Sequence, residues 1–232
     1  MATIFITGNS NGLGLGLTRL YLDQANQVYS LSRSECPLEH SNLHHGIQDL
    51  SQLDEIESSL QSLLPASLDL VILNAGILGK IEDLVDTSMQ DVKNIMDINV
   101  WSNKAIIDWL IKNNIKVKQL ILVSSGASIS GNRGWGTYSI SKASLNMMAE
   151  LYAHEMSDTH ITAYAPGLIH TKLQDYACNE VDTNKYPSIT NLVKAYKTEL
   201  MPDIDTAAKL ISLSFNKCLK FDSGSFVDIR QL

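Results

Sequence analysis

Short apolar runs rich in Val, Ile and Leu alternate along the chain with longer segments whose apolar residues recur at helical spacing. Nearly continuous apolar runs are typical of strands buried on both faces, and strands that alternate with helices form a parallel sheet with right-handed crossovers. The pattern therefore predicts an α/β fold: one doubly wound parallel sheet with helices on both faces. The runs cover Thr3 to Thr7, Gln27 to Ser32, Leu68 to Asn74, Lys118 to Ser124, Ile161 to Ala165 and Ser225 to Ile229.

Two of the intervening segments stand out. The stretch from Thr137 to Met156 has the apolar spacing of a helix packed on neighbouring elements, and Val92 to Ile111 is a second helical stretch. The least regular region runs from Leu173 to Pro202, and we expect it to form a lid over a substrate pocket. No repeat, low-complexity tract or linker divides the sequence, so residues 1–232 are predicted to form a single domain.

Composition narrows the class of partner. The 232 residues include 18 basic and 25 acidic ones, and the net charge of -7 argues against nucleic acid or an anionic membrane as the main partner. Three cysteines without paired spacing suit a reducing compartment, and no run is long enough to span a bilayer, so we expect a cytoplasmic protein. The six histidines, among them His44-His45 and His170, lack metal-ligand spacing, and no metal site is predicted.

A glycine-rich turn follows the first predicted strand and opens the next helix. Glycines let the backbone approach a pyrophosphate closely, while the free amides and the dipole at a helix N-terminus attract the anion. The glycine spacing differs from the common dinucleotide fingerprint, and tight strand-to-helix turns need glycine in any case, but the position after the first strand favours a nucleotide site. The residues of this turn are Gly8, Asn9, Ser10, Asn11, Gly12, Leu13 and Gly14.

The second predicted strand ends at Ser32-Arg33, where a free ribose 2′-hydroxyl would call for an acidic residue. Arg33 could instead pair with a 2′-phosphate, so NADPH is preferred over NADH as the cofactor, although a solvated surface arginine is the simpler alternative. After the short apolar turn His45 to Ile47, Asp49-Leu50 could lie beside the adenine. Asp49 could equally cap a helix that starts near Ser51.

Small and polar residues occur at two further positions. Asn74-Ala75-Gly76 closes the fourth strand, where small residues would let a cofactor cross the carboxyl edge of the sheet. Asn99 is a polar residue on the otherwise apolar stretch Val92 to Ile111. Taken alone, Asn99 is best interpreted as a satisfied buried amide.

Ser125, Tyr138 and Lys142 form the most informative group. Tyr138 and Lys142 are four residues apart on a predicted helix, so their side chains project from one face about one turn apart. A nearby ammonium would lower the pKa of the phenol from about 10 toward working pH, and Tyr138 would become a usable general acid. Singly, each residue has an ordinary explanation: an amphipathic tyrosine, a capping serine and a solvated lysine.

Together these residues resemble the short-chain dehydrogenases/reductases over almost the whole chain, from Thr7 to about Gly224. The resemblance rests on the glycine turn, Asn74-Ala75-Gly76, Asn99, Ser125, Tyr138, Lys142, and Pro166-Gly167 followed by Thr171. The joint order and spacing of these motifs are highly specific. The sequence Ser-Ser-Gly-Ala near Gly134-Trp135, with a basic residue after the second strand, looks like small cytosolic carbonyl reductases of the sepiapterin-reductase or benzil-reductase kind.

The resemblance implies a Rossmann-type domain and a role for each matching residue. Asn99, Ser125, Tyr138 and Lys142 would form a catalytic tetrad, in which Lys142 also holds the nicotinamide ribose and Asn99 positions a water. Pro166, Gly167, Ile169 and Thr171 would lie at the nicotinamide, with Ile169 and Thr171 holding its carboxamide. Family members are commonly homodimers or homotetramers, so an oligomer is expected on the same ground.

The resulting hypothesis is an NADPH-dependent enzyme that reduces a small-molecule ketone or aldehyde, or runs the reverse reaction. Trp135, Leu168, Leu173 and Tyr176 are candidates to line the substrate pocket and suggest an apolar or aromatic carbonyl compound, although core packing or a subunit contact would explain each equally well. The rival hypothesis is a non-catalytic dinucleotide sensor. A sensor would need the glycine turn but not Tyr138.

Overall fold

The computed structural model describes residues 1–232 and contains one seven-stranded sheet in which every pair of neighbouring strands is parallel, so the predicted doubly wound sheet is confirmed. The strand order is β3-β2-β1-β4-β5-β6-β7. The order reverses beside β1, which places the ends of β1 and β4 at the point where α/β sheets of this kind bind ligands. The strands are β1 (Thr3–Thr7), β2 (Gln27–Ser32), β3 (Leu43–Ile47), β4 (Ser67–Leu73), β5 (Lys116–Val123), β6 (His160–Ala165) and β7 (Phe226–Asp228).

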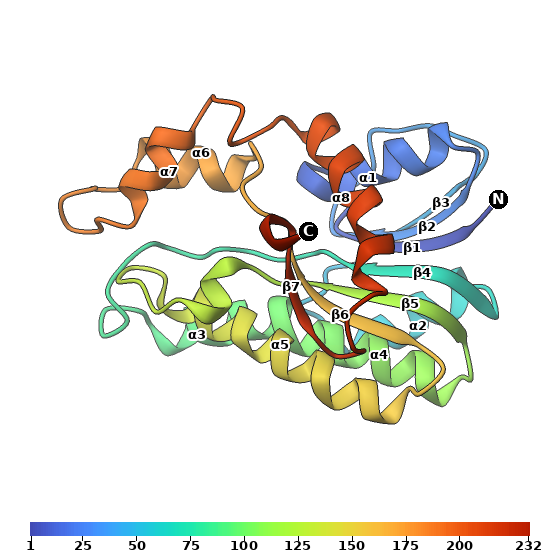
Figure 1. The fold of residues 1–232 in the computed structure, drawn as a ribbon. Coiled ribbons are helices and arrows are strands. Elements are labelled where there is room, and N and C mark those ends of the chain that lie inside the picture. Colours follow the sequence, from blue (N-terminus) through green and yellow to red (C-terminus); the bar gives the residue numbers. More distant parts are fainter.

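Helices cover both faces of the sheet (Figure 1). On one face α1 (Gly12–Asp23) and α8 (Ile204–Cys218) bury Leu17, Ile211 and Phe215 in a core cluster with β1 and its neighbours. The other face carries α2 (Leu53–Leu63), α4 (Ser102–Lys112) and α5 (Gly136–Glu155), which share a second cluster with β4 and β5. Strands buried from both sides in this way explain the continuous apolar runs of the sequence.

Three local predictions need correction. The turn predicted over His45 to Ile47 is the end of β3, which is an edge strand. Its residues His44 and Ile47 are exposed, so the strand lacks a continuous run of apolar residues.

The helical stretch predicted from Val92 to Ile111 is divided between two helices. These are α3 (Met89–Met96) and α4, and one π-helical turn, Asp97–Trp101, joins them. The irregular region from Leu173 to Pro202 contains two short helices, α6 (Lys172–Asn179) and α7 (Ile189–Ala195). The helix predicted from Thr137 to Met156 is confirmed as α5 within one residue at each end.

Helices α6 and α7 lie apart from the sheet, beyond its carboxyl edge (Figure 1). They are packed by a small cluster of their own, which we call the lid core: Leu78, Ile81, Trp135, Ala177, Tyr186 and Ile189. None of these six residues belongs to either of the two larger clusters.

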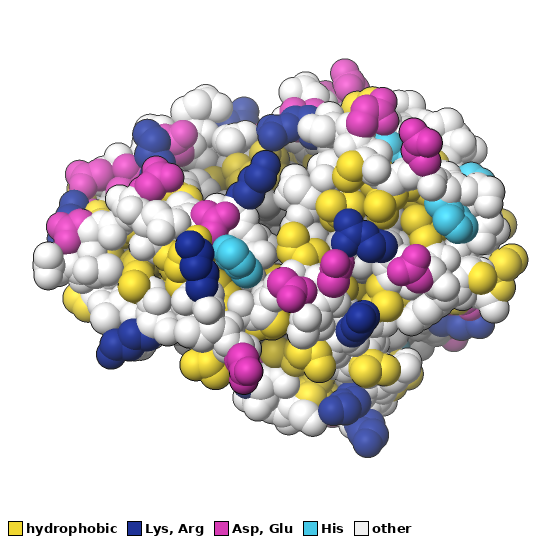
Figure 2. All heavy atoms as spheres, turned by 90° about the horizontal axis from the view of Figure 1, so that it is seen from above, with side chains coloured by type: hydrophobic (Ala, Val, Ile, Leu, Met, Phe, Trp, Pro, Cys, Tyr) yellow, Lys and Arg dark blue, Asp and Glu magenta, His cyan; other side chains and the backbone are white.

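The surface carries charges of both signs. On the face seen from above, acidic and basic side chains are interspersed (Figure 2). No helix has the length and apolar character that crossing a membrane requires.

Candidate active site

A cavity of about 810 Å³ opens at the carboxyl edge of the sheet and gathers most of the predicted site residues. It is lined by the turn after β1 and by residues at or just after the ends of the other six strands. Four predicted residues, Asn9, Gly14, Asn99 and Tyr176, do not line it. Those that do are Gly8, Ser10, Asn11, Gly12, Leu13, Ser32, Arg33, Asp49, Leu50, Asn74, Ala75, Gly76, Ser125, Trp135, Tyr138, Lys142, Pro166, Gly167, Leu168, Ile169, Thr171 and Leu173.

The glycine turn is held tightly between β1, α1 and β4. Gly8 has a φ of 75°, in the left-handed region that favours glycine. A Cβ on Gly14 would lie only 2.2 Å from the Gly8 carbonyl oxygen, so Gly14 allows α1 to pack against the turn rather than contacting a ligand itself. The Asn74 amide donates to the Thr7 carbonyl at 3.0 Å, which fixes the turn from β4.

Asn9 has a different place from the one predicted. Its side chain is fully buried and donates to the Ser30 hydroxyl at 2.8 Å, so it points into the protein and away from the cavity. The Ser30 hydroxyl also lies 3.0 Å from His45 Nδ1 on β3. Asn9 therefore ties the turn to the neighbouring strands, and its side chain does not line the cavity.

Arg33 and Asp49 flank the cavity beside the end of β2. Arg33 is exposed and takes part in none of the ion pairs of the protein, so its guanidinium is available to an anion. Asp49 accepts hydrogen bonds from the backbone and hydroxyl of Ser51 at 2.9 and 2.8 Å, and the backbone bond is the main cause that holds the pKa of the carboxyl below its usual range. Asp49 thus supports the approach to α2 and lines the cavity at the same time.

Tyr138 and Lys142 project from α5 as their spacing predicted. The Lys142 ammonium lies 5.7 Å from the centre of the Tyr138 ring and donates to the Val123 carbonyl at 2.7 Å. Only 4% of Lys142 is exposed, and burial lowers its pKa to about 8. A buried lysine with a single fixed acceptor is unusual and points to a functional rather than a solvated side chain.

The pKa of Tyr138 shifts in the direction opposite to the prediction. Burial raises the pKa of the phenol, and a polar interaction with the Ser125 side chain offsets this only in part. The ammonium of Lys142 is directed at Val123 and not at the phenol oxygen, so desolvation outweighs its charge. At neutral pH Tyr138 therefore carries its proton.

Asn99 lies in the π-helical turn between α3 and α4 and is fully buried. Its Oδ1 accepts from Ile77 N at 2.8 Å, and its Nδ2 donates to the Ile77 carbonyl at 2.8 Å and to the Ser141 hydroxyl at 3.0 Å. This is the satisfied buried amide that its sequence context suggested. A Cβ on Gly76 would meet both Asn99 Oδ1 at 3.2 Å and Lys142 Nζ at 3.4 Å, so Asn99 lies behind the cavity wall next to the lysine.

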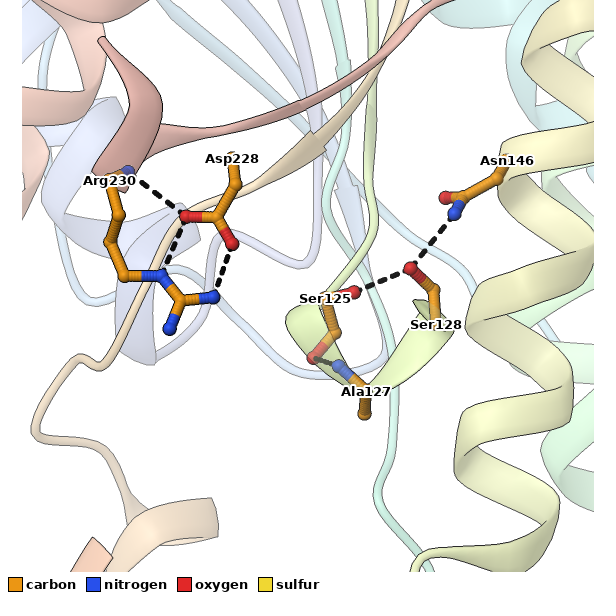
Figure 3. Close-up of polar contacts among 6 residues, drawn as sticks. All are labelled: Ser125, Ala127, Ser128, Asn146, Asp228 and Arg230. Carbon is orange, nitrogen blue, oxygen red and sulfur yellow. Dashed lines mark hydrogen bonds and ion pairs between the residues drawn. The ribbon is translucent and has the colours of Figure 1, made fainter. Parts of the chain in front are cut away.

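Ser125 is positioned by a network that the sequence did not reveal (Figure 3). Its hydroxyl accepts from Ala127 N at 3.1 Å, and its carbonyl accepts from the Ser128 hydroxyl at 2.6 Å. The Ser128 hydroxyl in turn accepts from Asn146 Nδ2 at 2.8 Å. Because Asn146 comes one helical turn after Lys142, α5 positions Ser125 as well as Tyr138 and Lys142. The four-residue spacing of Tyr138, Lys142 and Asn146 was the available signal.

A second unpredicted pair, Asp228 and Arg230, lines the same cavity at the end of β7. Asp228 is opposite Ala165 in the sheet, directly before the predicted cofactor segment Pro166-Gly167. The two side chains form an ion pair at 2.5 Å.

Tyr176 and Trp135 connect the lid helices to the body of the protein. The Tyr176 hydroxyl accepts from Ile81 N at 3.1 Å, so this residue anchors α6 instead of lining the pocket. Trp135 lines the cavity, and its indole donates to the Ser188 hydroxyl at 3.0 Å, just before α7. No group of three or more His, Cys, Asp or Glu side chains could hold a metal ion.

Comparison with known sequences gives consistent matches. The family model described as short chain dehydrogenase matches residues 2–182. An uncharacterized oxidoreductase of Schizosaccharomyces pombe is 31% identical over 97% of this chain and 95% of its own length. Benzil reductase from Bacillus subtilis is 27% identical over 75% of this chain and 77% of its own, and sepiapterin reductase from Bos taurus is 30% identical over 74% and 69%.

Solved structures share the fold. A short chain dehydrogenase/reductase from Saccharomyces cerevisiae matches with a TM-score of 0.84 and 21% identity over 99% of this chain and 96% of its own. The protein ElxO, solved with NADP bound, matches with a TM-score of 0.78 and 20% identity over 99% and 97%.

Proposed function

Because the chain belongs to the short-chain dehydrogenases, and is an oxidoreductase of that type, we propose that it uses NADPH to reduce the carbonyl group of a small molecule to an alcohol, or runs the reverse reaction. One observation carries the proposal: a single cavity holds Ser125, Tyr138 and Lys142 beside the glycine turn. The relatives named benzil reductase and sepiapterin reductase support a carbonyl substrate.

The residues of the cavity fit a nicotinamide dinucleotide. The close packing at Gly8 and Gly14 leaves the start of α1 free to receive a pyrophosphate, with Ser10, Asn11 and Gly12 lining the space. Arg33 lies free at the end of β2, where it would pair with a 2′-phosphate, and this supports NADPH over NADH.

At the far end of the cavity, Pro166, Gly167, Ile169 and Thr171 would hold the nicotinamide. They lie at the end of β6 and before α6, on the side of the cavity toward Ser125. When bound, the cofactor supplies a hydride to the carbonyl carbon.

The chain's own residues supply the proton and the polarisation. Tyr138, which burial keeps protonated, donates its proton to the carbonyl oxygen as the alcohol forms. The Ser125 hydroxyl donates a hydrogen bond to the same oxygen and stabilises the developing charge. Lys142, buried next to Asn99, holds a positive charge near the phenol. The family resemblance implies in addition that Lys142 holds the nicotinamide ribose and that Asn99 positions a water linking Lys142 to solvent.

Apolar side chains form part of the substrate end of the cavity. Trp135, Leu168, Leu173 and Leu192 line it, which supports an apolar or aromatic substrate. We place the lid at about residues 173–202, which contain α7 and all of α6 except its first residue, as part of one domain that spans residues 1–232. The lid core joins these helices to Trp135 at the start of α5.

Replacement of Tyr138 by Phe tests the mechanism. The variant keeps the ring but removes the acid, and general acid catalysis is worth about 10²- to 10⁴-fold, so NADPH-dependent carbonyl reduction should fall by that factor. Tyr29→Phe, on β2 and outside the cavity, should leave the rate unchanged. Full turnover of every accepted carbonyl by Tyr138→Phe would contradict the mechanism. NADPH binding without turnover of any carbonyl in the native protein would favour the sensor.

We also propose a homo-oligomer, either a dimer or a tetramer, that uses the outer face of α5. Ile140, Met147 and Leu151 are 49%, 55% and 56% exposed there at helical spacing, a row of large apolar side chains that a partner would cover. Light scattering coupled to size exclusion measures the mass in solution, and a monomer at micromolar concentration would refute this part.

A further inference from the structure

Arg230 is held rigidly at the carboxyl edge of the sheet by Asp228. Asp228 ends β7 and is only 3% exposed. Its carboxylate accepts from Arg230 Nε at 2.8 Å and from Nη2 at 2.5 Å, and the Arg230 backbone N–H donates to the same carboxylate at 2.9 Å. Two parallel hydrogen bonds to a planar guanidinium fix its plane as well as its position.

The guanidinium is placed beside Ser125 by the order of the strands. Ser125 follows β5 and Asp228 ends β7, two strands away in the sheet, or about 10 Å. The Arg230 side chain spans part of this distance, since a Cβ on Gly126 would lie 3.1 Å from its Nη2. Figure 3 shows the ion pair facing the turn that carries Ser125, and both line the cavity.

Asp228 uses only part of the hydrogen-bonding capacity of Arg230. A guanidinium has five N–H donors, and the carboxylate engages those on Nε and Nη2. Nη1 has no acceptor in the protein, and 71% of the side chain is exposed. The Nη1 edge is therefore a charge-assisted donor, held by Asp228, on a residue that lines the cavity.

The charge of the pair indicates which acceptor suits this donor. Asp228 stays ionised because its hydrogen bonds with Arg230 hold the pKa of the carboxyl below its usual range. Because the pair has no net charge, a carboxylate on the substrate would be attracted by the guanidinium of Arg230 and repelled by the carboxylate of Asp228. A neutral oxygen gains the hydrogen bond without that opposition.

We propose that Arg230 determines substrate specificity by donating a hydrogen bond from its free edge to a second, neutral acceptor oxygen of the substrate, while Ser125 and Tyr138 bind the reacting carbonyl. The substrate class is then a neutral carbonyl compound with a neighbouring carbonyl, ester or amide oxygen. Asp228 is a positioning residue that acts through Arg230. The inference rests on the proposed carbonyl reduction and adds a substrate class to it.

The test compares two ketones that differ only in the second oxygen: phenyl methyl diketone and phenyl ethyl ketone. The variant is Arg230→Met combined with Asp228→Asn, which leaves no unpaired buried carboxylate. A hydrogen bond from a charged donor is worth about 10- to 100-fold, so kcat/KM for the diketone should fall by that factor while kcat/KM for the monoketone changes less than about threefold. Asp228→Asn alone should raise KM for the diketone and leave KM for the monoketone unchanged.

A matched control removes another arginine–aspartate pair. Arg19 and Asp205 form an exposed ion pair between α1 and α8, outside the cavity, so Arg19→Met with Asp205→Asn should change neither ketone's kcat/KM. In all variants Kd for NADPH should stay within about threefold of its value in the native protein, because the proposed contact is with the substrate.

Four outcomes would overturn the inference. An equal loss with both ketones would make Arg230 a structural residue, and a parallel rise in Kd for NADPH would make it a cofactor contact. A kcat/KM for phenylglyoxylate more than about tenfold above that for the diketone in the native enzyme would show that the site takes an anion. Failure of the native enzyme to reduce any carbonyl compound would refute the proposed function itself, whereas the first three outcomes leave that function standing.

Discussion

Replacing Lys142 by Met should make the ligand-free protein more stable and, at the same time, inactive. Lys142 is 4% exposed, and its pKa falls from 10.5 to about 8 on folding because burial disfavours the charged form. Between these values the unfolded chain binds a proton that the folded protein does not, so stability rises with pH across this window. Below pH 8 the folded protein carries the buried charge at its full free-energy penalty.

The magnitude follows from the shift. Because the pKa of Lys142 falls from 10.5 to about 8 on folding, its charge lowers the free energy of unfolding by about 3 kcal/mol at pH 7. At about pH 9.5, where the folded protein has lost this proton, the loss of stability is about 1.4 kcal/mol. Met also leaves the Val123 carbonyl without its donor, which costs about 1 kcal/mol. Lys142→Met should therefore raise the free energy of unfolding by about 2 kcal/mol at pH 7, which is about 4–8 °C in Tm for a chain of this size. At about pH 9.5 the increase should be close to zero.

Differential scanning calorimetry of both proteins without cofactor, at about pH 7 and about pH 9.5, measures this difference directly. Lys93→Met, at an exposed position of α3, is the control and should show the same Tm difference at both pH values. If Lys142→Met were no more stable than the native protein at pH 7, or if its advantage did not shrink with rising pH, the account of a charge buried for function would be wrong. Carbonyl reduction should be lost at both pH values.

Three further substitutions test the cofactor turn, the phosphate contact and the support of the serine. Gly14→Ala places a Cβ 2.2 Å from the Gly8 carbonyl oxygen and should raise Kd for NADPH at least about tenfold in a fluorescence titration. Gly131→Ala is the control, because no atom lies within 4 Å of its Cβ and Kd should not change. Equal affinities of the two variants for NADPH would refute the packing argument. Arg33→Ala should weaken NADPH about tenfold or more and NADH hardly at all, and equal effects would exclude the 2′-phosphate contact. Asn146→Ala should lower kcat/KM about tenfold in steady-state assays, since the network that holds the serine loses its support; an unchanged value would show that the network is dispensable.

Features encoded by neighbouring residues were predictable from the sequence. The buried strands appear as apolar runs because both of their faces are covered, and the relative placement of Tyr138 and Lys142 follows from four-residue spacing on one helix. The edge strand β3 escaped notice because solvent reaches His44 and Ile47. In the same way, α6 buries only Ala177 and α7 only Ile189 and Ala195, which is too few to produce a clear helical pattern of apolar residues.

Features that depend on the assembled sheet could not be predicted. Arg230 reaches the turn at Gly126 only because β5, β6 and β7 are neighbours, and nothing within a short window of sequence records that order. The inward direction of the Asn9 side chain depends on Ser30, 21 residues away. The pKa of Tyr138 depends on burial, which outweighed the charge that its spacing from Lys142 brought close.

The separateness of the lid core affects how this protein can evolve. Its six residues pack α6 and α7 without contributing to the two clusters that hold the sheet together. Tyr186 and Ile189 do not line the cavity themselves, but Leu173 and Leu192, which do, pack against the lid core. Substitutions at Tyr186 or Ile189 can therefore shift these two side chains while the stability of the sheet is largely preserved. Substrate preference can thus change during evolution through substitutions in the lid core alone. Laboratory libraries confined to these positions should yield a high fraction of folded variants.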